Sequence, residues 1–176
     1  MEKILSNGQN KTSLLQFLQT EWSQDKYATK LQHKHLYVTS EESCLHLSST
    51  TNMDKLQSEE VPQLTCQHEE ADTRLFLHAK HAADHGHSNI LIRSSDTDVE
   101  VLALHHTKNI AAHIYLQSGT EKHSKWIDVS LLASQLGEDV CDGLPGIHAL
   151  TGCDSVSAFV YRGKRFWQVQ MARDGR

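Results

Sequence analysis

Helix-type and strand-type apolar patterns alternate at short intervals through the middle of the chain, and this alternation restricts the possible folds more than any other feature. In chain order, the expected elements are a helix, a strand, a helix, a strand and a short strand leading into a helix, over residues 69–85, 89–95, 96–108, 111–119 and 125–137. Such alternation is typical of α/β domains with a mainly parallel sheet and helices on both faces. The sequence therefore predicts a three-layer α/β/α domain.

The flanking segments have simpler patterns. We expect a helix, two strands of a hairpin, a surface loop and a turn-rich segment leading into a last helix, over residues 10–22, 35–39 with 44–48, 49–65 and 143–154. The expected organisation is one domain, residues 1–160, and a basic tail, residues 161–176. This tail has five basic residues and one acid.

Composition excludes several classes of protein. A length of 176 residues with 38% apolar residues fits one globular domain. The sequence has no apolar run long enough to span a membrane, and we expect no secretory signal. The four cysteines form no CxxC pair, which favours a reducing intracellular compartment, nuclear or cytoplasmic. A net charge of −5 does not decide for or against nucleic acid, because clustered metal-binding acids also lower it.

The first acidic cluster opens the helix expected at residues 69–85. Wound at about 100° per residue, the helix has an apolar stripe, and Asp72 falls inside it. A carboxylate within an apolar stripe is costly unless it is paired or bound to a metal. Glu70 lies in the first turn, where it also complements the helix dipole. Taken alone, the acids of this segment are explained about equally well by helix capping and by metal binding. The position of Asp72 within the apolar stripe favours metal binding.

The second cluster directly follows a buried strand. Asp96 and Asp98 lie where ligands bind in open α/β sheets, beyond the carboxyl end of a strand. Paired carboxylates suit Mg²⁺ or Mn²⁺. The alternative is that Asp96 is a helix N-cap and Asp98 a dipole complement. A phosphatase of the haloacid-dehalogenase type is a minor rival, because Arg93 separates the apolar strand from the acids and Glu100 replaces the expected hydroxyl.

The third cluster is Asp154, which follows Gly152 in a glycine-rich turn. Alone it is most simply an N-cap. Together, His-Glu-Glu-Ala-Asp at 68–72, Ser-Ser-Asp-Thr-Asp at 94–98 and Thr-Gly-Cys-Asp at 151–154 resemble the ordered acidic motifs of the flap endonuclease (PIN-like) superfamily. The string LPGIHALTGCD resembles more closely a group of uncharacterised, transposon-associated animal proteins with a PIN-like fold. The resemblance covers roughly residues 10 to 163.

The resemblance implies phosphodiester hydrolysis of DNA or RNA with Mg²⁺ or Mn²⁺, as an endonuclease or a 5′→3′ exonuclease. The metal ligands implied are Glu70, Asp72, Asp96, Asp98 and Asp154, with Asp72, Asp96 and Asp98 at the catalytic centre. The candidate phosphate contacts are Arg74, Lys122, Lys125, Arg162, Lys164 and Arg165. Trp126 is a candidate for base stacking, although a buried position in the core is favoured for it.

The sequence also departs from the flap endonuclease pattern. The strand that normally opens the domain and ends in a metal-binding Asp has no counterpart, so we expect a domain that lacks its first strand. The basic helical arch and the helix-hairpin-helix have no candidates either. The alternative function is therefore a catalytically inactive PIN-like domain of a decayed transposon-derived protein, which binds nucleic acid or a protein partner.

Overall fold

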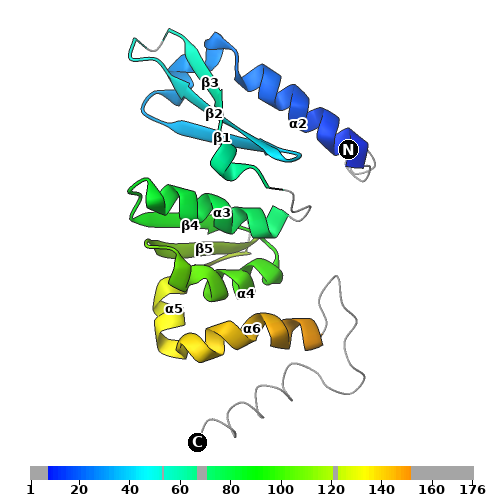
Figure 1. Ribbon diagram of the computed structural model, residues 1–176, viewed down its shortest axis with the longest axis vertical. Helices are drawn as coiled ribbons and strands as arrows, with labels where there is room; N and C mark the ends of the chain where they lie inside the picture. The colour runs from blue at the N-terminus through cyan, green and yellow to red at the C-terminus, as the bar shows by residue number, and fades with distance from the viewer. Residues whose placement is uncertain (1–7, 53, 67–70, 121–122, 152–176) are drawn as a thin grey trace, which may run out of the picture. The chain divides into compact units, whose positions relative to one another are not determined.

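The computed structural model describes residues 8–52, 54–66, 71–120 and 123–151 (Figure 1). The chain is a mixed α/β protein with two small three-stranded sheets. It divides into two compact units, residues 1–70 and residues 71–176, and each unit has one of the sheets. The expected α/β class is confirmed at this level.

The first unit is an antiparallel sheet with helical segments before and after it. Its elements are α2 (Gly8–Trp22), η1 (Asp25–Leu31), β1 (His35–Ser40), β2 (Ser43–Ser49), β3 (Leu56–Glu60) and η2 (Pro62–Leu64). The strand order is β1-β2-β3, and both pairs are antiparallel. The expected hairpin is confirmed, and Glu41 in its turn has a φ of 51°. The core of this unit contains Ala28, Val38, Cys44, Leu47 and Leu64.

The prediction of a surface loop over residues 49–65 is wrong for part of that segment. Residues 56–60 form β3, which pairs with β2 along its whole length. Four of its five side chains are exposed, so the strand lacks the alternation of apolar and polar residues that predicts a half-buried strand. Its hydrogen bonds to β2 hold it in the sheet instead.

The second unit contains the alternating part of the chain. Its elements are α3 (Ala71–Asp84), β4 (Asn89–Arg93), α4 (Thr97–His106), η3 (Thr107–Asn109), β5 (His113–Thr120), β6 (His123–Asp128), α5 (Val129–Leu136) and α6 (Glu138–Thr151). The strand order is β4-β5-β6. β4 and β5, which α4 connects, pair in parallel, whereas β6 pairs antiparallel with β5. Among the described strands, the sheet thus has one parallel and one antiparallel pair.

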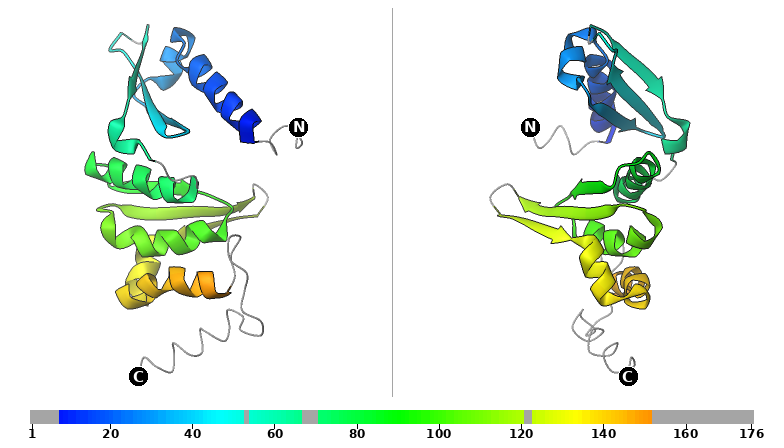
Figure 2. Two further views of the ribbon diagram at one scale, coloured as in Figure 1. Left: turned by 45° about the vertical axis from the view of Figure 1, so that its right-hand side comes forward. Right: turned by 90° about the vertical axis from the view of Figure 1, so that its left-hand side faces the viewer.

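The core of the second unit lies between one face of this sheet and the helices α3 and α4. Ile92, Ile114 and Leu116 of the strands pack there with Phe76 of α3 and Val99 of α4. The right-hand view of Figure 2 shows these helices on one side of the strands. Described helices cover this face of the sheet, and the three-layer PIN-like arrangement remains a prediction.

The segment that follows α5 differs from the sequence-based expectation. The sequence predicts a turn-rich segment at residues 143–151, but these residues belong to α6, with Pro145 inside the helix. Proline removes one backbone donor and crowds the preceding turn, so local propensity disfavours a helix here. α6 packs extensively against α4, and this tertiary packing outweighs the local cost. The helix predicted to begin near Asp154 lies outside the described residues.

Candidate functional site at the carboxyl end of β4

The chain reverses direction between β4 and α4 through a short, well hydrogen-bonded connection. The backbone N–H of Ser94 donates to the carbonyl of Gln117 on β5 at 3.1 Å, which extends the sheet by one residue. The hydroxyl of Ser94 accepts from the N–H of Asp96 at 3.1 Å. This connection fixes the backbone at Asp96, and Asp98 follows in the first turn of α4.

Asp96 is the N-cap of α4. Its backbone is extended, with φ −88° and ψ 133°, and its Oδ1 accepts from the N–H of Asp98 at 2.9 Å. The N-cap interpretation that the sequence left open for Asp96 is therefore confirmed. A cap of this kind uses one carboxylate oxygen, so it is compatible with a second role for the same side chain.

Asp98 lies in the first turn of α4 and is held by a histidine from α6. Nε2 of His148 lies 2.6 Å from Oδ1 of Asp98, and the two side chains are 12% and 29% exposed. With Asp98 ionised, the imidazole N–H is the donor in this short bond. The pair joins positions that are 50 residues apart in the sequence. It makes His148 a member of the candidate site.

His148 is a member of the candidate site that the sequence motifs did not indicate. The residue lies inside the string LPGIHALTGCD, which carries the resemblance, but the segment was predicted to be a turn. Only the helical conformation of α6 and its packing on α4 bring the histidine to Asp98. An imidazole within such a specific string was the one available signal.

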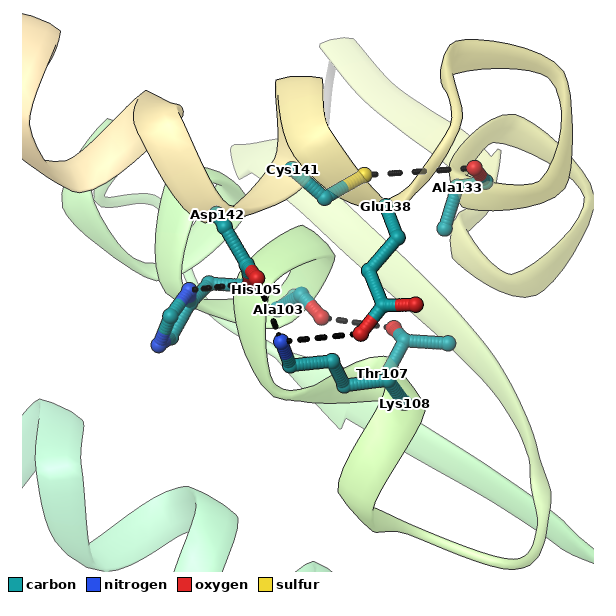
Figure 3. A network of polar contacts seen from close by, with 8 residues as sticks. All are labelled: Ala103, His105, Thr107, Lys108, Ala133, Glu138, Cys141 and Asp142. Atoms are coloured by element: carbon teal, nitrogen blue, oxygen red, sulfur yellow. Dashed lines mark hydrogen bonds and ion pairs between the residues drawn. The ribbon is translucent and has the colours of Figure 1, made fainter.

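A second polar network fixes the start of α6 against the end of α4 (Figure 3). Nζ of Lys108 lies 2.5 Å from Oδ2 of Asp142 and 3.2 Å from Oε1 of Glu138. The hydrogen bond with Asp142 raises the pKa of Lys108 and lowers that of Asp142. Cys141, which is buried, points its thiol toward the carbonyl of Ala133 in α5 at 3.9 Å. These contacts hold the helix that carries His148.

Asp72, the third predicted catalytic residue, is half-buried in the first turn of α3. The apolar stripe predicted for this helix is confirmed, because Phe76 and Ala79 are buried in the core. Arg74 on the same helix is half-buried, and Lys125 on β6 is exposed. The remaining predicted residues lie outside the described part of the chain: Glu70, Lys122, Asp154, Arg162, Lys164 and Arg165.

Within the described ranges, no group of three or more His, Cys, Asp or Glu side chains is arranged to hold a metal ion. Asp72, Asp96 and Asp98 therefore do not form a three-ligand site by themselves. Two of the five implied ligands, Glu70 and Asp154, are not described. What the described residues provide is a pair of carboxylates, from Asp96 and Asp98, at the start of one helix.

A pocket of about 390 Å³ is lined by residues of α4, β5, β6 and α5. Its wall combines apolar residues with three charged ones, Glu100, Lys125 and Asp128. Trp126 also lines it, and this side chain is 61% exposed. The favoured expectation of a core position for Trp126 is therefore wrong. β6 is an edge strand, and its Trp126 side chain is not covered by a further strand of the described sheet.

Comparison of the chain with protein-family models, with curated proteins and with solved structures finds no match. The helices of the described part of the chain are too short or too polar to cross a bilayer.

Proposed function

We propose that this protein contains a nuclease-like domain that hydrolyses phosphodiester bonds of DNA or RNA with Mg²⁺ or Mn²⁺. The observation that carries the proposal is the position of Asp96 and Asp98, which open α4 directly after a strand in parallel pairing. Ligands of open α/β sheets bind beyond the carboxyl ends of such strands, and hard cations prefer carboxylate oxygens. The proposal also includes a three-layer PIN-like fold and an intracellular location, nuclear or cytoplasmic.

In this proposal, each described side chain has a defined role. Asp98 supplies a carboxylate whose direction His148 fixes, as hydrogen-bonded partners commonly do for metal-ligating carboxylates. Asp96 supplies a second carboxylate whose backbone is fixed by the cap. Asp72, with Glu70 and Asp154, completes the ligand set implied by the sequence. A bound divalent ion would lower the pKa of the attacking water and stabilise charge on the phosphate.

A second function is favoured by a specific observation. Asp96 is already satisfied as a cap, Asp98 is already paired with His148, and the described residues contain no three-ligand group. These contacts stabilise the fold without any metal. The alternative is therefore a PIN-like domain that has lost catalysis and binds nucleic acid or a protein partner.

A cleavage assay separates the two functions. Labelled single-stranded and flap oligonucleotides are incubated with the full chain in Mn²⁺, and Asp98→Asn is the test variant because its amide oxygen can still accept from His148. The nuclease proposal expects cleavage that depends on Mn²⁺ and is lost in Asp98→Asn. Absence of cleavage, or equal cleavage by the variant, would reject it.

A further inference from the structure

One face of the β4-β5-β6 sheet has no described helix packed on it. Side chains alternate along a strand, so Ile92, Ile114 and Leu116 face α3 and α4, and their neighbours face the other way. Leu91 of β4 is 48% exposed and Trp126 of β6 is 61% exposed, in contrast to the buried isoleucines. We define the open face by six of these outward residues, which are Leu91, Arg93, Tyr115, Gln117, Trp126 and Asp128.

Two cross-strand rows organise the open face. Arg93 pairs with Gln117, which pairs with Trp126, so a cation, an amide and an indole lie in one row. The neighbouring row is Leu91, Tyr115 and Asp128. With strands about 4.8 Å apart, the ends of each row are about 10 Å apart. Arg93 and Trp126 thus lie at a spacing that their long side chains can bridge, next to the ring of Tyr115 in the second row.

This face has one cation and one carboxylate, and the cation is the one available to a ligand. Its one carboxylate, Asp128, is engaged twice, by Nε2 of His113 at 2.8 Å and by the N–H of Leu131 at 2.9 Å. Arg93, by contrast, is exposed and forms no ion pair with any described residue. The net result is an accessible guanidinium in the same row as an exposed indole.

We propose that the open face binds single-stranded nucleic acid, with bases stacked on Trp126 and Tyr115 and a phosphate held by Arg93. Exposed aromatic rings on a sheet, combined with a cation, form the usual platform for unpaired bases. The row containing Arg93 is the last of β4, three residues before Asp96, so the platform adjoins the candidate metal site. The claim that single-stranded nucleic acid is the substrate rests on the proposed function. The claim that this face binds single strands does not require catalysis.

The test is binding without metal. A fluorescein-labelled 12-nucleotide oligodeoxythymidine is titrated with the full chain in EDTA, and fluorescence anisotropy is measured. Trp126→Ala is expected to weaken binding by about 5- to 150-fold, the range that one stacked base contributes. Phe17→Ala is the matched control, because Phe17 is 62% exposed and belongs to the other unit. It should leave the affinity unchanged, and Trp126→Phe should retain most of it.

Arg93→Gln provides an independent readout. Loss of one phosphate contact should reduce the slope of log affinity against log salt by about 0.7 for a single strand, whereas Lys55→Gln should not change it. Unchanged affinity in Trp126→Ala would overturn the inference. Binding of a duplex as tight as that of the single strand would also overturn it. The inference would also be overturned if the wild-type chain did not bind the oligonucleotide but self-associated through Trp126.

The outcome is separable from that of the nuclease proposal. If the open face binds single strands but there is no metal site, oligonucleotide binding persists in Asp98→Asn and in EDTA. Mn²⁺ then has no effect on cleavage or on thermal stability. If there is a metal site but the open face does not bind single strands, Trp126→Ala leaves the oligonucleotide affinity unchanged and Mn²⁺ binding persists.

Discussion

Asp96 combines two roles in this account, and replacing it by Ala and by Asn separates them. As the N-cap of α4, it accepts from the N–H of Asp98 at 2.9 Å. Asp→Ala at such a position costs about 1 kcal/mol of unfolding free energy, whereas Asn caps as well as Asp. For a unit of this size, about 1 kcal/mol corresponds to a fall in melting temperature of about 4–8 °C.

Without metal, we therefore expect Asp96→Ala to lower the melting temperature by that amount and Asp96→Asn to leave it within about a degree of wild type. With Mn²⁺ at a hundred times its dissociation constant, the wild type should gain about 2.7 kcal/mol. Both variants should lose most of this gain, because each removes a charged ligand.

The assay is thermal unfolding followed by circular dichroism, with and without Mn²⁺. Two results would refute the reasoning. An Asp96→Ala variant as stable as the wild type without metal would show that the cap does not contribute to stability. A full Mn²⁺ gain in Asp96→Asn would show that Asp96 is not a metal ligand, whatever its role as a cap.

Two further predictions concern the fold of the second unit. Leu116→Ala, in the fully buried core, should reduce the unfolding free energy by about 2–5 kcal/mol, whereas Leu131→Ala, at a site 52% exposed, should cost far less; urea denaturation measures both, and equal effects would contradict the core assignment. Burial lowers the pKa of His106, so stability should be complete above the unfolded value of about 6.5 and fall as pH drops toward the folded pKa. His106→Gln should reduce this pH dependence in denaturation at pH 7.5 and 5.5, and an unchanged dependence would exclude His106 as its source.

The sequence predicts the α/β class, the hairpin and the alternation of helices and strands in the second unit, because these elements have clear apolar periodicity. β3 has none, since pairing with β2 rather than burial of its side chains holds it in the sheet. α6 contradicts local propensity, because packing against α4 outweighs the cost of Pro145. Such long-range effects are not visible in a window of neighbouring residues.

The same limit applies to the candidate site. The capping role of Asp96 could be read from the strand-to-helix boundary, and it is confirmed. The contact of His148 with Asp98 could not be predicted in this way. It depends on a helix that the local sequence disfavours, and it joins residues that are 50 positions apart. A core position was favoured for Trp126 over base stacking, whereas this side chain on the edge strand β6 is 61% exposed.

Binding of Mn²⁺, followed by the electron paramagnetic resonance signal of the free ion, tests the central claim most directly. Wild-type protein should bind Mn²⁺, Asp98→Asn should bind it far more weakly, and Asp84→Asn, an exposed aspartate paired with Lys80, should behave as wild type. Equal binding by wild type and Asp98→Asn, or no binding by either, would contradict a divalent-metal site at the end of β4.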